Sequence, residues 1–410
     1  MRILYIIIVF LGFTYFLFKK RYFDIFSLAF FSYFIYFLPA LFGYINYPEG
    51  SQGELLDETY LVYIIVLTSV IIGATLFDIF NKISFKKIKI NINNIKNKKY
   101  YNCSMFVFII FFLLFIYLNF NELISPGKPS FGRTHHMFTL TISISILITY
   151  LLNRKRTTIF LLVLLLIDVY GGNREAFATV FLSLFVIYNY KNYGKAKMGF
   201  NISNYILAMS SGVFLFSYKH IYQAVLRGDW DLVFNRITSF EFYINSITDS
   251  EPFITQMILN KTIEESFEIG IEYLFSFIVI IFPLSNYLFN IDIFTFSSEF
   301  TKTFYPDISF GLASNVFAEI IALNGFFSLF IFIIINLIII SIASYFLIYI
   351  DNVLIKSVSI LMSSYWVFFL NRTGLLYQLT IQRRLIFWFM LILIISYFTN
   401  LIKFNFSLNN

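Results

Sequence analysis

The sequence predicts an all-α, polytopic integral membrane protein. Hydrophobic residues make up 59% of the 410-residue chain and charged residues only 13%, whereas about a quarter of the residues in a soluble domain are charged. Apolar runs of membrane-spanning length recur from one end of the chain to the other, and basic residues are concentrated in short segments between them. These features predict about eleven helical crossings, with a range of about ten to thirteen, and one large loop.

The apolar runs set the expected spans. In chain order they cover residues 3–18, 25–44, 60–80, 104–120, 137–152, 158–170, 176–190, 202–216, 326–350, 357–370 and 385–401. A further apolar stretch, 273–289, contains Pro283 and fits either a re-entrant hairpin or a true span. The first span is expected to be retained, because it has no small-residue cleavage site and basic residues follow it.

The basic segments predict the orientation. Segments 19–21, 82–99, 154–156 and 191–197 are rich in lysine and arginine, and the span order puts all four on one side. The positive-inside rule makes that side cytoplasmic. The N-terminus is therefore expected outside and the C-terminus inside. The loop that carries Glu54 and Asp57 has no Lys or Arg and falls on the outer side.

Three regions follow from these spans: N-terminal transmembrane helices in 1–217, a large extracytoplasmic loop in 218–325, and C-terminal transmembrane helices in 326–410. A loop of this length is usually functional or disordered. This loop is rich in aromatic residues and has few Gly or Pro, so we expect short helices on the membrane surface. The pattern indicates helices in 231–242 and 261–273.

A tight turn presents the first candidate binding residue. Gly171 and Gly172 allow close backbone approach, and Arg174 follows at the outer interface. Ionisable groups near lipid are costly and are often retained for function, so Arg174 is a candidate ligand for a phosphate or sugar. The alternative is a plain hairpin with a snorkelling arginine.

Further cations are expected at the outer surface. Lys219, His220 and Arg227 follow the eighth span and suit an anionic headgroup or diphosphate; the alternative for His220 is a solvated helix end. A last group of arginines is expected on the outer side, against the positive-inside rule. Cations in such a position indicate an anionic partner. The alternative is that the rule, which is statistical, carries less weight for so short a loop. The members of this group are Arg372, Arg383 and Arg384.

The candidate bases, which would take the proton from an acceptor hydroxyl, are His220 and Glu319. Glu319 lies near the predicted membrane boundary, where a desolvated carboxylate can accept a proton. It could equally be a structural group that hydrogen-bonds a helix end. Trp230 in the outer loop is expected to stack on a sugar ring. The sequence has no Walker motif, dinucleotide fingerprint, zinc-ligand cluster or Gly-x-Ser-x-Gly elbow, so we expect no metal, no cofactor and no nucleic-acid partner.

In its architecture the chain resembles bacterial O-antigen or capsule repeat-unit polymerases of the Wzy type. The likeness covers most of the chain: a basic turn after the first span, the Gly172-Asn173-Arg174 turn, a large outer loop, and a later run of small and polar residues. That run consists of Gly311, Asn315, Ala318, Glu319, Asn324 and Gly325.

The resemblance implies a glycosyltransferase of the bacterial cytoplasmic (inner) membrane that joins undecaprenyl-diphosphate-linked oligosaccharides on the outer leaflet. It implies that Arg174 holds the anionic substrate, and that a chain-length regulator and a flippase are partners, with membrane lipid around the protein. Two other functions stay open. One is a lipid-linked oligosaccharide flippase, for which a charged cavity at mid-membrane and internal repeats are typical. The other is a different outer-face glycan ligase or acyltransferase.

Overall fold

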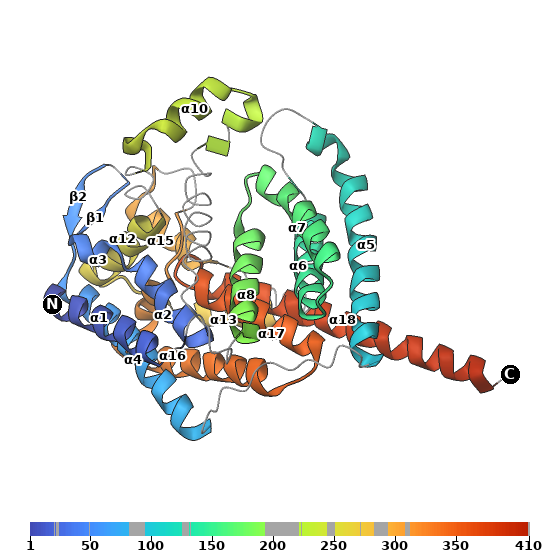
Figure 1. Cartoon of the computed structure of the whole chain (residues 1–410). Coiled ribbons are helices and arrows are strands. Elements are labelled where there is room, and N and C mark those ends of the chain that lie inside the picture. Colours follow the sequence, from blue (N-terminus) through green and yellow to red (C-terminus); the bar gives the residue numbers. More distant parts are fainter. Residues whose placement is uncertain are drawn as a thin grey trace. The chain divides into compact units, whose positions relative to one another are not determined.

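The protein is predominantly α-helical, and the only strands in its described part form one short hairpin. The structure is a computed structural model (Figure 1) and describes residues 1–19, 21, 24–48, 50–81, 95–124, 131, 133–192, 221–222, 224–243, 251–270, 272–282, 294–307 and 312–408. Five of its helices are long and apolar enough to cross a membrane. They support a multi-pass membrane protein.

The chain forms two compact units. The first comprises Met1–Ser84, Thr248–Tyr345 and Ser363–Arg383, and the second comprises Phe85–Ile247, Phe346–Met362 and Arg384–Asn410. Each unit therefore combines parts of all three regions defined on the sequence.

In its described residues, the first unit contains nine elements of its own. They are α1 (Arg2–Phe18), α2 (Ile25–Tyr36), α3 (Pro39–Phe42), β1 (Tyr44–Asn46), β2 (Gln52–Glu54), α4 (Asp57–Asn81), α12 (Glu251–Glu264), α13 (Tyr273–Ile281) and α15 (Phe296–Phe304). Three helices contribute to both units: α16 (Val316–Tyr349), α17 (Val353–Phe369) and α18 (Leu375–Leu408).

The elements that belong to the second unit alone, among the residues that the structure describes, are α5 (Ile95–Ile124), α6 (Arg133–Leu151), α7 (Lys155–Tyr170), α8 (Glu175–Asn192) and α10 (Trp230–Thr238). Helix α6 packs against α5, α7 and α8 (Figure 1). Small and hydroxyl residues let it do so, since Ser143, Ser145 and Thr149 are all buried and Ser143 bonds back to its own helix. Such residues allow close helix packing in a membrane protein.

Helix α12 lies in the core of the first unit rather than on a membrane surface, where sequence reasoning expected the loop helices. It contacts α2, α3, α4 and β1, and residues 255–260 are all buried. The predicted helix over 261–273 is wrong, because α12 ends at Glu264 and Ser266 adopts a left-handed conformation with φ 49°. The helix expected over 231–242 is found in part as α10, which ends at Thr238, before the extended Ser239.

The predicted spans coincide with helices wherever the structure describes them, with two interruptions and one gap. One interruption is a kink at Asn119 of α5, within the span expected over 104–120. The span expected over 25–44 breaks after Tyr36. Pro39 then starts the short α3, and Gly43 ends it with φ 84°. The span expected over 202–216 lies outside the described residues.

Polar side chains join three of the helices inside the apolar core of the first unit. Asn336 of α16 donates to the Tyr33 hydroxyl of α2 at 2.8 Å and accepts from the Trp366 indole of α17 at 2.8 Å. All three side chains are buried. Hydrogen bonds of this kind link helices where the surrounding groups are apolar.

Helix α16 is not continuous. Asn324 and Gly325 have non-helical dihedral angles, and Gly325 adopts φ 59°, a conformation that favours glycine. The break separates the turn that carries Glu319 from the long apolar part of the helix. It coincides with the predicted start of the span at residue 326. The first unit thereby holds Glu319 on a short helical segment of its own.

Candidate functional site

The candidate site lies in the first unit, where α16 and α18 begin and α17 ends. Asn315 starts α16: its side-chain oxygen accepts from the backbone N–H groups of Phe317 (2.9 Å) and Ala318 (3.3 Å). Its amide nitrogen donates to the Thr255 carbonyl of α12 at 2.9 Å. One buried asparagine therefore caps α16 and fixes its first turn against α12.

Glu319, in the first turn of α16, is completely buried and accepts two hydrogen bonds. The Tyr273 hydroxyl donates to Oε1 at 2.5 Å, and the backbone N–H of Leu375 donates to Oε2 at 2.9 Å. Leu375 is the first residue of α18. A carboxylate is stabilised there because the N-terminus of a helix carries partial positive charge. The structure thus places the predicted base at a helix end.

The chain approaches this carboxylate so closely that a side chain would not fit. A Cβ added at Gly374 would lie 2.6 Å from Glu319 Oε2 and 3.1 Å from Ser314 Oγ. Gly374 precedes Leu375, whose N–H bonds the carboxylate. The glycine is therefore required for close approach rather than for an unusual φ.

A cation, Arg372, lies in the same α17–α18 connection as Gly374. Arg372 Nε is 3.0 Å from an oxygen of Glu251, in the first turn of α12. The Arg372 carbonyl accepts from the Ser314 N–H at 3.1 Å, which joins the α17–α18 connection to the segment before α16. The side chain of Arg372 is 33% exposed, so this guanidinium, unlike Glu319, can meet a solute.

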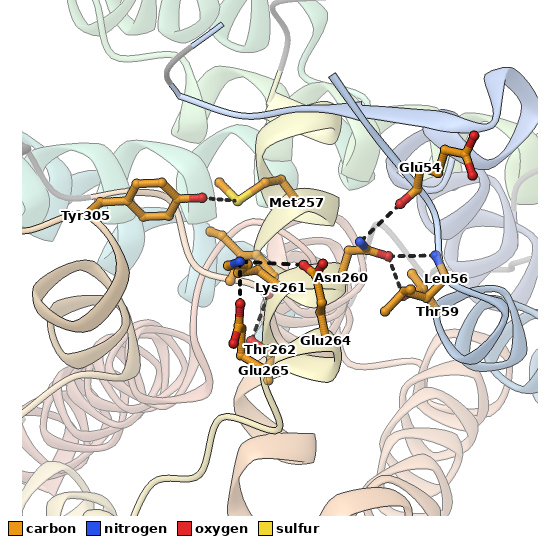
Figure 2. A network of polar contacts seen from close by, with 11 residues as sticks. Glu54, Leu56, Thr59, Met257, Asn260, Lys261, Thr262, Glu264, Glu265 and Tyr305 are labelled. Atoms are coloured by element: carbon orange, nitrogen blue, oxygen red, sulfur yellow. Dashed lines mark hydrogen bonds and ion pairs between the residues drawn. The ribbon is translucent and has the colours of Figure 1, made fainter. Parts of the chain in front are cut away.

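Figure 2 shows the polar contacts of the part of α12 that follows Thr255. Asn260 Oδ1 accepts from the Leu56 N–H (2.9 Å) and the Thr59 hydroxyl (2.8 Å), and Nδ2 donates to the Glu54 carbonyl (3.3 Å). The neighbouring Lys261 donates to Glu265 at 2.6 Å. That hydrogen bond raises the pKa of the Lys261 ammonium.

The second unit has a polar centre of its own, at the end of α7. His135 Nε2 lies 2.5 Å from Asp168 Oδ1, and both side chains are buried. The Asn173 side chain also hydrogen-bonds the Asp168 carboxylate. The Asn173 N–H donates to the Asp168 carbonyl at 3.1 Å. The turn that leads to Arg174 is therefore fixed to α7 and, through His135, to α6.

The predicted site residues are divided between the units. Glu319, Arg372 and Arg383 belong to the first, and Arg383 donates to the Ile280 carbonyl of α13. The second unit contains Arg174, Arg227, Trp230 and Arg384. Lys219 and His220 lie outside the described residues.

The predicted residues of the second unit differ in exposure. Arg174 is half-buried just before α8, and Arg227 is exposed. Trp230 begins α10 and is 57% exposed, as stacking on a ring would require.

Sequence reasoning missed two partners that define these centres. Asp168 could have been found, because it is an ionisable residue within an apolar run. Tyr273 gave no comparable signal, since it is one of 29 tyrosines and lies 46 residues before Glu319.

No protein-family profile, curated protein or solved structure matches this chain.

Proposed function

We propose that this protein is a polysaccharide repeat-unit polymerase, which transfers an undecaprenyl-diphosphate-linked oligosaccharide to a second lipid-linked glycan on the outer leaflet of the bacterial cytoplasmic membrane. The observation that carries the proposal is the placement of a buried carboxylate, Glu319, at the helix junction that also carries Arg372. Glycosyl transfer from a diphosphate needs a proton acceptor and cationic groups near the leaving group.

The proposed reaction forms one glycosidic bond and breaks one bond between the donor sugar and its diphosphate. The acceptor hydroxyl oxygen forms a bond to the anomeric carbon of the donor sugar, while the bond from that carbon to the diphosphate oxygen breaks. Glu319 takes the hydroxyl proton, and the outer arginines neutralise the undecaprenyl diphosphate that leaves. Because Glu319 is fully buried, acceptor access requires the junction of α16 and α18 to open.

The proposed topology has eleven crossings, with the N-terminus outside and the C-terminus in the cytoplasm. Contacts within the units support it, because they join segments that the topology assigns to the same side. On the outer side, the N-terminal ammonium lies 3.4 Å from Asp57. On the inner side, Arg21 lies 3.0 Å from Asp78, and the Val353 N–H donates to Asn97 at 3.5 Å.

Two substitutions at one hydrogen bond test the base. Glu319→Gln removes the proton acceptor and leaves a single oxygen for two donors. Tyr273→Phe removes the same Tyr273–Glu319 hydrogen bond and retains the carboxylate. We expect both variants to lose similar stability, about 1–3 kcal/mol. Only Glu319→Gln should lose glycan extension completely, while Tyr273→Phe retains transfer at a reduced rate.

The assay uses purified protein with a lipid-linked repeat unit and measures longer glycans and released undecaprenyl diphosphate. Equal losses of transfer in the two variants, in proportion to their losses of stability, would assign Glu319 a structural role only. If the wild-type protein moves the lipid-linked substrate across vesicles and forms no glycosidic bond, the polymerase proposal is wrong and the flippase takes its place.

A further inference from the structure

Several buried polar atoms at the α17–α18 connection have no hydrogen-bond partner in the described part of the chain. They are both amide atoms of Asn371, Oε1 of Gln378 and the hydroxyl of Ser314. Asn371 and Gln378 are completely buried, and Ser314 is 9% exposed. A buried polar atom without a partner is destabilising, so four of them in one place require an explanation.

The three residues meet the chain close to Gly374, whose Cβ position would lie 2.6 Å from Glu319 Oε2. Ser314 Oγ lies 3.1 Å from the position of a Gly374 Cβ. The Gln378 N–H donates to the Gly374 carbonyl at 3.2 Å, and its amide nitrogen donates to Thr373 Oγ1 at 2.8 Å. Asn371 lies three residues before Gly374, in the same connection.

These side chains are uncharged, and together they can both donate and accept hydrogen bonds. The Asn371 amide offers two N–H donors and one carbonyl oxygen, and the Ser314 hydroxyl can donate or accept. A diphosphate would be matched by cations, and an isoprenoid chain by apolar groups. Neighbouring hydroxyls of a sugar ring are matched by paired amide and hydroxyl groups, because each hydroxyl both donates and accepts.

We propose that Asn371, Gln378 and Ser314 form a binding subsite for the hydroxyls of an uncharged sugar, beside Glu319. The inference rests on the proposed polymerase and assigns this connection to the sugar rather than to the diphosphate. Binding there would give each unpaired atom a partner. It would also bring a sugar hydroxyl to the first turn of α18, where the Glu319 carboxylate is held.

The test separates sugar binding from folding. Asn371→Leu and Gln378→Met have nearly the same shape as the native side chains. Asn371→Leu removes two unpaired atoms, whereas Gln378→Met removes the unpaired Oε1 together with the amide nitrogen that bonds Thr373. Replacing an unpaired buried polar group by an apolar one of similar shape does not destabilise a protein. Ser344→Ala is the matched control, because Ser344 Oγ is also buried without a described partner but lies in the last part of α16.

The probe is the glycan repeat unit of the producing cell, released from its lipid diphosphate by mild acid. The measurement is the shift in Tm of the purified protein in detergent as the probe is added. We expect wild type and Ser344→Ala to shift equally. In Asn371→Leu and Gln378→Met the apparent affinity should fall at least tenfold. The Tm of Asn371→Leu without probe should equal or exceed that of wild type, because both of its amide atoms are unpaired.

Two results would overturn the subsite. The first is an unchanged probe-induced shift in both variants when the wild type responds. The second is a lower Tm of Asn371→Leu without probe, because it would show that the amide is paired within the protein. If the wild type neither binds the probe nor extends glycans, the polymerase proposal itself fails. If it extends glycans and the variants bind normally, only the subsite is wrong.

Discussion

His135 Nε2 lies 2.5 Å from Asp168 Oδ1, in a buried pair that joins the first turn of α6 to the last turn of α7. The ring of His135 also stacks on Phe131, with ring centroids 5.0 Å apart. The same carboxylate holds the Asn173 side chain. One aspartate in an apolar helix therefore organises the end of two helices and the turn that carries Arg174.

The first prediction concerns this pair. Asp168→Ala leaves the buried His135 ring without its hydrogen-bond partner, and an unsatisfied buried polar group costs about 1–3 kcal/mol. Lys302→Ala is the control, because its ion pair with Glu299 is solvent-exposed and such pairs contribute about 0–1 kcal/mol. Unfolding in detergent, followed by tryptophan fluorescence, measures both. Equal small losses would contradict a structural role for the pair.

The second prediction compares two neighbours on α12 (Figure 2). Asn260→Ala removes three hydrogen bonds, to Glu54 and Leu56 before α4 and to Thr59 in its first turn, from a side chain that is 1% exposed. We expect a loss of about 2–4 kcal/mol, at about 1 kcal/mol for each bond. Lys261→Ala removes partly exposed ion pairs and should cost less than about 1 kcal/mol. Chemical denaturation gives both values, and the reverse order would contradict the anchoring role of Asn260.

The third prediction concerns close approach at the candidate site. Gly374→Ala places a methyl group 2.6 Å from Glu319 Oε2, so the carboxylate or the backbone must shift. Overpacking of this kind costs about 1–3 kcal/mol. Gly270→Ala is the control, since the nearest atom to its Cβ position is 3.9 Å away. The Tm values of the two variants measure the difference. A Gly374→Ala protein as stable as wild type would show that the site accommodates a methyl group beside Glu319.

The fourth prediction tests orientation. Reporters fused after Lys99 and after Arg156 should read cytoplasmic, because they follow basic segments, and one fused after Asp249 should read outside. A pair of enzymes active on opposite sides of the membrane provides the measurement. An outside signal at Lys99 would overturn the topology and the site assignments that depend on it.

The fifth prediction concerns the donor diphosphate. Arg174→Ala should abolish glycan extension while the protein still accumulates in the membrane, because a bidentate contact to phosphate is lost. Arg174→Lys should restore it poorly, since an ammonium cannot replace a planar guanidinium. Gel analysis of surface polysaccharide length checks both variants, and normal long chains in Arg174→Ala cells would remove this residue from the site.

The outer loop should give a different phenotype. The sequence from Asp229 to Glu272 is strongly acidic, so it should contact sugars rather than the diphosphate. Trp230→Ala removes an exposed ring and should change chain length or sugar selectivity more than the basic reaction. A complete loss of transfer in that variant would place Trp230 closer to the reacting bond than we propose.

The sequence by itself determined the class of this protein and the extent of most of its helices. Hydropathy is a local property, so a run of apolar residues predicts a membrane-spanning length whatever it packs against. The break at Asn324 and Gly325 was likewise readable, because the sequence placed the start of a span at residue 326 and Gly325 permits the positive φ found there. The same reasoning singled out Glu319 as an acidic residue near a membrane boundary, but left open whether it was a base or a helix-end ligand.

Only the tertiary structure decided what these residues contact. Tyr273 and Leu375, the partners of Glu319, lie 46 and 56 residues away in the sequence. The placement of α12 in a core also depends on distant segments, because its Asn260 bonds residues about 200 positions earlier in the chain. Hydrogen bonds between such distant residues are fixed by how helices pack and where their ends meet, and neither composition nor periodicity encodes that pairing.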